Sequence, residues 1–468
     1  MPTSPASPAT PRLRRVLTLW DLVLYGIIVI QPTAPMPLFG VVSTVAQGHV
    51  VTTLLIGMFA MMLTAVSYGR MARAYPSAGS AYTYVGREIN PHLGFVTGWA
   101  MAMDYMINPL ICTIWCSKAA MNILPLPYVV WAVFFASLFT GLNLLGIKAT
   151  ARRNAILTVG MGIVIVAFFV SAVRYIVGME GWGGLFSTKP FYDPETFSWP
   201  LVSTGASIAV LTYIGFDGIS TLSEDVENPR RNIMLATVLV CFVTGILGGF
   251  QVYFGQLIWP DFQNFPDPDT GFVSAAGRAG TAWGAAGGVI LFQLVNVTLL
   301  VATIGSGSGA QLGAARLLWG MGRDNVLPRR YFGYLDPRRN TPQFNIVLTG
   351  VVALVGALSI SYQLGAELLN FGAFIAFMGV NIAALTHYFV RGRSRGLKEV
   401  FVYLLPPLVG FLVCFYIWLS LRTPAKLAGA AWLLVGVLYI AGKSNFFRRP
   451  IVMPDPPPES EREVTSDE

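Results

Sequence analysis

Two of the long apolar segments in this chain are interrupted near their centres, and these interruptions constrain the fold more than any other feature. The first lies within residues 26–40 and contains three prolines, and the second lies within residues 212–218 and contains two glycines. A helix broken inside a bilayer leaves backbone N–H and C=O groups that lipid cannot satisfy, so the break persists only where it lines a cavity or binds a ligand. We therefore expect a transport site at the two breaks, in a chain built from two repeats.

The composition is that of a polytopic membrane protein. Of the 468 residues, 54% are hydrophobic and 12% are charged, and the mean hydropathy of +0.61 excludes a soluble core with a polar shell. Because about 18 or more apolar residues are needed to span a bilayer as a helix, the sequence predicts an all-α fold of about twelve transmembrane helices. The expected spans are 17–46, 50–72, 93–123, 127–146, 154–178, 199–224, 233–258, 281–319, 343–361, 364–390, 399–421 and 424–442.

The positions of lysine and arginine predict how these spans are oriented. Short cytoplasmic loops of membrane proteins carry an excess of both residues. With the N-terminus inside, 25 of the 31 basic residues lie on the cytoplasmic side. The others are Lys118, Arg174, Lys189, Arg278, Arg422 and Lys426. We therefore expect both termini in the cytoplasm, with residues 1–12 and 446–468 as disordered ends. The net charge of +8 then reflects topology and requires no nucleic-acid partner.

Neither a metal centre nor an enzyme active site is expected. The four cysteines all lie in predicted spans, where thiols usually pack as small hydrophobic groups. Cys112 and Cys116 share a helix face, but a metal site would need further His or carboxylate ligands, and the three histidines lie at helix ends. The sequence also contains no recognisable combination of a nucleophile, a base and a group that orients the base, as an enzyme active site would require. The sequence thus predicts a protein without enzymatic activity and without a resident cofactor.

Two carboxylates are predicted to lie inside the membrane. Asp104 falls in the third span, and Asp217 lies beside the second break. An ionised Asp at the bilayer centre costs about 2.5 to 3.5 kcal/mol on the insertion scale, so each needs a compensating partner. That partner is a substrate ammonium group, a transported proton, or hydrogen bonds from neighbouring helices and water. Glu224, at the cytoplasmic end of the sixth span, lies near Arg230, where we expect a solvated or gate-forming salt bridge.

A glycine-rich run at residues 305–309 has two interpretations. Small residues allow close helix packing in membranes. Alternatively, the hydroxyl groups of Ser306 and Ser308 bind a cation near the first break. The run lacks the Gly-Lys-Ser/Thr that follows in a phosphate-binding loop.

Two long motifs carry a resemblance to a known family. One covers residues 68–84 and is followed by Gly-Phe-Val-Thr-Gly-Trp at 94–99, and the other covers residues 215–232, beginning Gly-Phe-Asp-Gly-Ile-Ser. With these motifs in this order, the chain resembles the amino acid-polyamine-organocation superfamily of transporters from about residue 13 to residue 445. The resemblance implies a leucine-transporter-like fold with two inverted five-helix repeats, at 13–198 and 199–391, and two further helices at 392–445.

Within that superfamily, the chain looks most like bacterial putrescine importers. The features concerned are residues 316–328, residues 369–373 and the pair Asp104 and Tyr105. The family's usual Gly-Ser/Ala-Gly in helix 1, whose N–H groups hold an amino acid carboxylate, aligns here with Pro32-Thr33-Ala34, and proline donates no hydrogen bond. An acidic residue that some polyamine relatives carry shortly afterwards is replaced by Pro37. An α-amino acid and a polyamine therefore both stay open as substrates.

The coupling ion is also open at this point. Proton-coupled relatives often place a lysine inside helix 5 where sodium-coupled relatives bind sodium, and Met161 takes that place here. Sodium at Ser306 and Ser308, a proton on Asp217 or Asp104, exchange without an ion, and uptake of a cation along the membrane potential are all consistent with the sequence.

From these features we predict a permease of the bacterial inner membrane that imports amino acids or small amines, including polyamines, by alternating access. The expected substrate contacts are polar and backbone groups of Gln31, Thr33 and Ala34, unwound backbone at Gly215 and Gly218, an aromatic wall of Tyr213 and Phe216, and the carboxylates of Asp104 and Asp217. A nutrient sensor that binds ligand without net flux is the alternative, disfavoured because the tails are too short for a signalling domain. A channel is disfavoured because two broken helices suit an occluded site better than a continuous pore.

Overall fold

The computed structural model describes residues 17–75, 80–146, 151–222, 226–323, 325–336, 339, 341–392 and 396–446. Over these residues the chain is almost entirely helical, and eight helices are long and apolar enough to cross a membrane. Apart from Phe446, the two predicted disordered ends lie outside the described residues.

Each predicted span corresponds to one helix or to one interrupted helix. In chain order they are α1 (Leu19–Ile30) with α2 (Phe39–Val45), α3 (Val50–Ala74), α5 (Pro91–Met121), α6 (Tyr128–Leu144), α7 (Ala151–Glu180), α8 (Trp199–Ala209) with η2 (Val210–Tyr213) and η3 (Phe216–Leu222), α9 (Pro229–Ile258), α11 (Ala285–Arg323), α13 (Gln343–Ser359), α14 (Tyr362–Leu385) with η6 (Thr386–Val390), η7 (Val400–Leu404) with α16 (Leu405–Leu419), and α17 (Thr423–Lys443).

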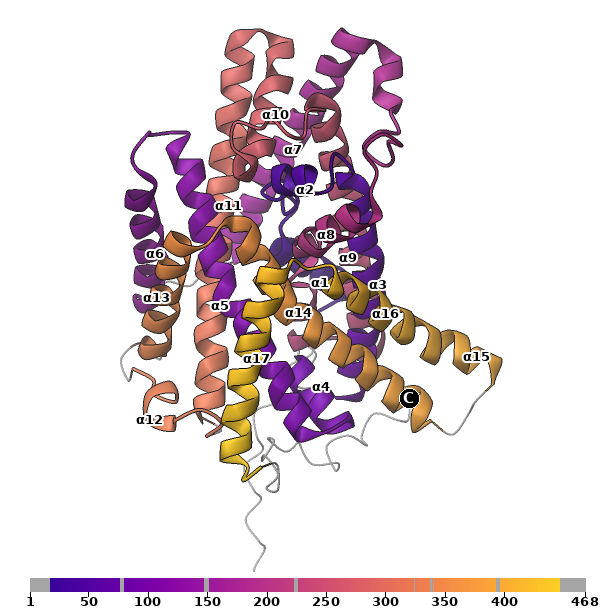
Figure 1. Ribbon diagram of the computed structural model, residues 1–468, viewed down its shortest axis with the longest axis vertical. Helices are drawn as coiled ribbons and strands as arrows, with labels where there is room; N and C mark the ends of the chain where they lie inside the picture. Colours follow the sequence, from indigo (N-terminus) through magenta and orange to yellow (C-terminus); the bar gives the residue numbers. More distant parts are fainter. Residues whose placement is uncertain are drawn as a thin grey trace, which may run out of the picture.

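Short helices that hydropathy does not predict connect these spans. They are α4 (Ser80–Glu88), η1 (Trp182–Phe186), η4 (Pro268–Thr270), α10 (Gly271–Gly280), η5 (Thr281–Trp283), α12 (Arg329–Phe332) and α15 (Leu397–Glu399). A helix far shorter than the bilayer has too few consecutive apolar residues to be predicted as a span, so the sequence does not indicate these short helices. In Figure 1, α10 lies at one end of the molecule and α4 and α12 lie at the other. By the charge pattern, the α10 end is the predicted outer end and the α4 end is the predicted cytoplasmic end.

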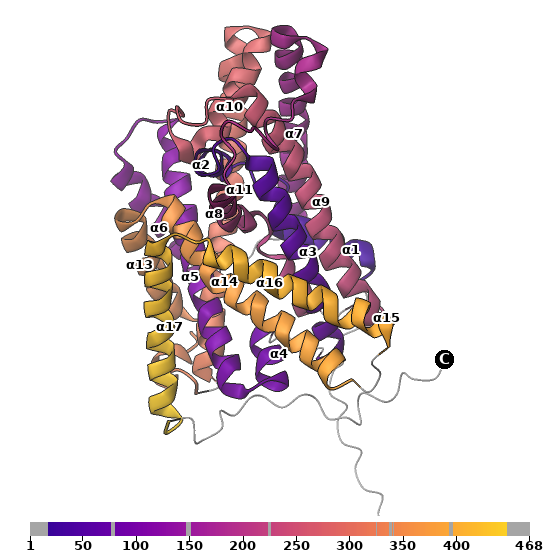
Figure 2. The ribbon, with the colours of Figure 1, turned by 45° about the vertical axis from the view of Figure 1, so that its right-hand side comes forward.

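The spans pack as two groups with α14 between them. In one group α3 lies along α9, which also contacts α1, and α8 packs on α3. In the other group α5 packs against α6, α11 and α13. Helix α14 contacts α5 from the second group and α3 and α8 from the first, and Figure 2 shows α14 passing in front of α5 toward α4. Residues far apart in the sequence therefore meet at the centre of the molecule.

The first span is interrupted because three prolines follow α1. Gln31 adopts a φ of 72°, and residues 32–38 form consecutive turns before α2 begins. Proline cannot donate the helical hydrogen bond, and its ring clashes with the preceding turn. The carbonyl group of Pro32, which no longer has a helical partner, accepts a hydrogen bond from Nε2 of Gln251 in α9 at 2.9 Å. The break is therefore held by a neighbouring helix rather than exposed to lipid.

The sixth span is interrupted at Gly215. The segment η2 ends at Tyr213, and Gly215 turns the chain with a φ of 115° before η3 begins. Only glycine adopts such a conformation without steric strain. A Cβ atom at Gly215 would meet the side chains of Val29 and Ile30 at 3.1 and 3.6 Å. The two breaks therefore lie side by side.

The predicted outer end is held together by contacts among α2, η4 and α5. A Cβ atom on Gly40 would lie 2.2 Å from the carbonyl oxygen of Pro268, so glycine is required for this close approach of two backbones. The ammonium group of Lys118 lies 2.9 Å from the carboxylate of Asp267 and 3.0 Å from that of Asp269. Helix α5 is thus tied to the segment around η4.

Candidate functional site

The carboxylate of Asp217 is part of the second break. Asp217 lies in the first turn of η3 and is 9% exposed. Its carboxylate lies near the backbone N–H groups of Gly215, Gly218 and its own residue, which favour its negative charge. The first N–H groups of any helix lack internal partners and carry partial positive charge, so a carboxylate at this position is stabilising. Asp217 therefore holds the unwound backbone in place as well as carrying charge into the site.

Asp104 brings a second carboxylate to the same place from α5. It is 8% exposed and interacts electrostatically with Asp217. Among the described residues, none donates a hydrogen bond to its carboxylate, and none places a Lys, Arg or His nitrogen within 4.0 Å of either aspartate. Two neighbouring carboxylates in a buried site need an external cation or a proton to offset their repulsion and desolvation. The arrangement is therefore suited to binding positive charge.

Four tyrosines from different elements surround this acidic pair. Tyr25 in α1, Tyr68 in α3, Tyr84 in α4 and Tyr105 in α5 all interact electrostatically with Asp217. The hydroxyl group of Tyr68 is buried and has no hydrogen-bond partner among the residues that the structure describes. Aromatic faces attract cations, and phenolic hydroxyl groups can hydrogen-bond to an ammonium group. The tyrosines thus add to the cation-binding character of the site.

Sequence reasoning missed most of this tyrosine cluster. Tyr68 and Tyr84 are the first and last residues of the motif that carried the family resemblance, and Tyr105 was noted only for its pairing with Asp104. Tyrosine is common in membrane helices, and no local pattern indicates which ones converge. The available clue was that tyrosines are frequent in the motif at residues 68–84.

The predicted aromatic residues Phe216 and Tyr213 lie in different environments. Phe216 packs edge-on against the ring of Tyr68 at 5.4 Å and contacts Phe377 of α14 at 5.5 Å. The hydroxyl group of Tyr213 donates to the carbonyl oxygen of Leu54 at 2.9 Å. Phe216 therefore belongs to the aromatic wall beside the acidic pair, whereas the hydroxyl end of Tyr213 fastens η2 to α3.

The predicted contacts in the first break reach toward α7 and α11. Nε2 of Gln31 donates to the carbonyl oxygen of Ala302 in α11 at 3.0 Å, and the hydroxyl group of Thr33 lies 3.6 Å from the sulfur of Met161 in α7. The backbone N–H of Ala34 donates to the carbonyl oxygen of Gln31 at 3.1 Å. That N–H is thus already used within the turn and is not available to a carboxylate without rearrangement.

Ser306 and Ser308 contact different neighbours. Ser306 lies near the thiol of Cys112 in α5, which itself donates to Oδ1 of Asn108 at 3.3 Å. The backbone carbonyl of Ser308 accepts from Asn143 in α6 at 3.0 Å. Residues two positions apart are rotated by about 200° about the helix axis, so their side chains point to nearly opposite sides of the helix. The structure does not direct the two hydroxyl groups toward one point, and their role in binding an ion stays a prediction.

The predicted cytoplasmic gate falls on residues whose contacts are not described. Glu224 lies outside the described residues. The side chain of Arg230 does too, although its backbone belongs to the first turn of α9. In the part of the chain that the structure does describe, Leu17 forms a parallel β-bridge with Val226, and the N–H of Glu227 donates to the carbonyl oxygen of Leu17 at 2.9 Å. The start of α1 is thus joined to the segment that precedes α9.

Comparison with known proteins adds an independent finding. The model of the family described as amino acid permease matches residues 33–435. The low-affinity putrescine importer PlaP of Escherichia coli strain K12 is 35% identical over 454 residues, which cover 95% of this chain and 97% of that protein. The methylthioribose transporter of Bacillus subtilis strain 168 is 27% identical, covering 93% of this chain and 95% of its own length. The branched-chain amino acid permease BcaP of Lactococcus lactis subsp. cremoris strain MG1363 is 26% identical, covering 92% and 95%.

Proposed function

The chain belongs to the amino acid permease family of the amino acid-polyamine-organocation superfamily, and from this premise we propose that its substrate is a small organic cation with two amine groups. Family membership confirms the predicted leucine-transporter-like fold and a membrane transporter of amino acids or amines, without enzymatic activity. Import across the bacterial inner membrane by alternating access is part of the proposal.

The acidic pair is the observation that carries this proposal. Asp104 and Asp217 are both buried, they interact with each other, and no described basic side chain neutralises them. A dication would offset both charges, with one ammonium group at Asp104 and the other near Asp217 among the tyrosines. The substrate in the name of the 35% identical importer, putrescine, is a diamine of this class.

The first break argues against an α-amino acid as the preferred substrate. Holding a carboxylate there would require backbone N–H groups. Pro32 has none, and the N–H of Ala34 donates to Gln31, so of these three residues Thr33 alone has a backbone N–H without a described backbone acceptor. A carboxylate entering the site would also approach two buried aspartates, which would repel it. A diamine meets neither obstacle.

Thermal stabilisation of the purified full-length protein tests the substrate class. The panel is putrescine, a monoamine of the same length, leucine and lysine. A ligand at 100 times its Kd raises the free energy of unfolding by about 2.7 kcal/mol. We expect putrescine to raise the melting temperature most, and Asp104→Asn to remove this effect. Stabilisation by α-amino acids alone would contradict the proposal.

Uptake into proteoliposomes separates transport from sensing. A transporter accumulates labelled putrescine with saturable kinetics, whereas a sensor would bind it without flux. Asp104→Asn serves as the matched control, because it removes the proposed ammonium partner without touching the backbone of either break. Binding without uptake in the wild-type protein would favour the sensor alternative.

A further inference from the structure

The side chain of Arg70, near the predicted cytoplasmic end of α3, forms no salt bridge with any acid that the structure describes. Its guanidinium group lies over the ring of Tyr403 in η7, 5.2 Å from the ring centroid. Nη1 is buried and has no hydrogen-bond acceptor among the described residues, although the side chain as a whole is partly exposed. An arginine carries five N–H donors, and burying a donor without an acceptor is unfavourable. The site is therefore incomplete as it stands.

The aromatic residues around Arg70 hold its position. The hydroxyl group of Tyr388 in η6 donates to the carbonyl oxygen of Arg70 at 2.9 Å. The rings of Tyr388 and Tyr403 stack with 5.4 Å between centroids and 10° between planes. Arg70 is thus fixed between α3, η6 and η7 by contacts that do not use its guanidinium donors.

Of the two described acids in the neighbouring elements α4 and α15, Glu399 forms no salt bridge with a described basic residue, and Glu88 is already engaged. Glu88 accepts from Nδ1 of His387 at 2.5 Å, from Nη1 of Arg391 at 3.0 Å and from the hydroxyl group of Tyr75. Arg73, one turn beyond Arg70, interacts electrostatically with Tyr388 and forms no salt bridge with a described acid. The region between α3, η6 and η7 therefore has a net positive charge.

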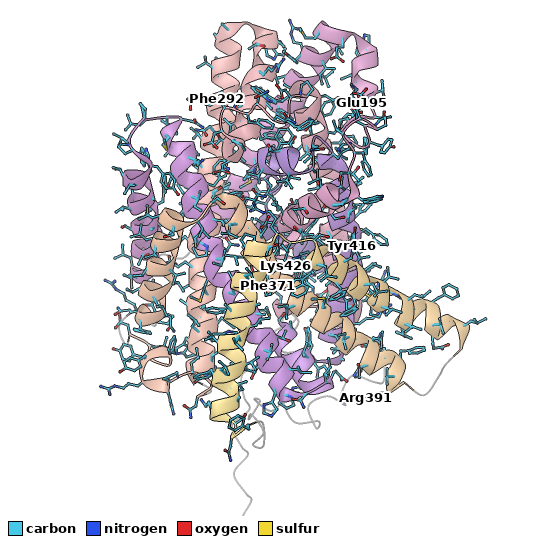
Figure 3. The ribbon with its side chains drawn as sticks, viewed as in Figure 1. Glu195, Phe292, Phe371, Arg391, Tyr416 and Lys426 are labelled. Carbon is cyan, nitrogen blue, oxygen red and sulfur yellow. The ribbon has the colours of Figure 1, made fainter. Side chains whose placement is uncertain are left out.

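The surroundings of this charge belong to the membrane interface. Val390, Leu397 and Phe401, from the same turns of η6, α15 and η7, are 54%, 80% and 66% exposed. Figure 3 places Arg391 at the end of α14 that points away from α10, which is the predicted cytoplasmic end. Apolar side chains facing lipid beside basic side chains at this depth are typical of positions where phospholipid headgroups contact a protein.

We propose that Arg70 and Arg73, with the hydroxyl group of Tyr403, bind a phosphate group between α3, η6 and η7. A guanidinium group pairs with phosphate through two parallel hydrogen bonds, which would supply the acceptor that Arg70 lacks. The exposed apolar neighbours favour an anionic phospholipid headgroup as the source of this phosphate, with its acyl chains along Val390 and Phe401. This site is separate from the transport site and does not depend on the substrate proposed above.

Native mass spectrometry of the full-length protein in detergent tests this site. The probes are phosphatidylglycerol, phosphatidylethanolamine and inorganic phosphate, each added at the same molar ratio. We expect one phosphatidylglycerol to bind well above the level of phosphatidylethanolamine, and Arg70→Gln to weaken it about tenfold, the effect of losing a charge-assisted hydrogen-bonded pair. Arg70→Lys, which keeps the charge but loses the planar fork, should weaken it less and provides a second variant if Arg70→Gln does not fold.

Arg330 provides the matched control. It also lies over a tyrosine ring at the predicted cytoplasmic end, 5.7 Å from the centroid of Tyr331, but it is exposed. Arg330→Gln should leave lipid binding unchanged. Equal loss in Arg330→Gln, or unchanged binding in both Arg70 variants, would overturn the proposal. Binding of inorganic phosphate that depends on Arg70, without binding of the lipid, would keep the phosphate site and overturn the lipid headgroup as its source.

Discussion

At the scale of single residues, the two buried aspartates differ in what holds them. The carboxylate of Asp217 lies near backbone N–H groups of the second break that favour its charge, whereas no such group accompanies the carboxylate of Asp104. Contact of either carboxylate with a substrate stays a prediction, but their surroundings suggest different roles. Asp217 combines a structural role with its charge, and Asp104 is the carboxylate that awaits a partner.

This difference predicts opposite effects on stability. Asp217→Asn should lower the free energy of unfolding by about 1 to 3 kcal/mol. A carboxylate presents two acceptor oxygens to the N–H groups of the break, whereas the neutral amide of asparagine presents only one. Asp104→Asn should leave the melting temperature unchanged or raise it, because it removes an unpaired buried carboxylate. Thermal unfolding of both variants without ligand checks this. Equal destabilisation by the two substitutions would contradict the assignment of roles.

At the scale of elements, α5 connects the site to the predicted outer end. Asp104 lies near the middle of α5, and Lys118 near its end binds Asp267 and Asp269 beside η4. Together with the close approach of Gly40 to Pro268, these contacts hold the segment η4–α10 over α2. The alternating access that we propose would open this end, so we expect these contacts to break in the transport cycle.

Lys118→Met should shift the protein toward an outward-open state. The substitution leaves two neighbouring carboxylates without their cation, which favours their separation. A Thr33→Cys background reports opening, because Thr33 is 1% exposed and the native cysteines are buried. We expect labelling by an impermeant thiol reagent to become severalfold faster.

The control for this experiment is another lysine at the same end. Lys189 pairs with Asp193 at 3.9 Å, and its side chain is 78% exposed. An exposed pair of this kind contributes little to stability. Lys189→Met should therefore leave labelling unchanged, and a similar acceleration in both variants would show that general loss of charge, rather than the Lys118 contacts, is responsible.

At the scale of the whole molecule, the charge of the substrate should determine what drives uptake. The membrane potential contributes about 2.3 kcal/mol per charge per 100 mV. This corresponds to about fiftyfold accumulation of a substrate with one charge, and to the square of that factor for a substrate with two charges. We expect an inside-negative potassium diffusion potential to drive putrescine uptake into proteoliposomes without a proton or sodium gradient. Uptake that instead requires a sodium gradient would favour the site predicted at Ser306 and Ser308.

The sequence by itself determined the membrane class, the spans and the two breaks. These features follow from local rules, since bilayer thickness selects the length of each apolar run, and proline and glycine interrupt a helix wherever they occur. The same rules predicted that Asp104 and Asp217 needed partners, because an ionised carboxylate deep in a bilayer is unfavourable without them. These rules do not predict short helices such as α4 and α10, because such helices do not cross the membrane.

Only the tertiary structure decided which side chains meet. Tyr25, Tyr68 and Tyr105 come from three helices, and their convergence on Asp217 depends on how those helices pack. The same packing assigned the Asp217 carboxylate to the broken backbone and directed Ser306 and Ser308 to different neighbours. Helix packing depends on contacts between residues far apart in the chain, and a local pattern contains no information about such contacts.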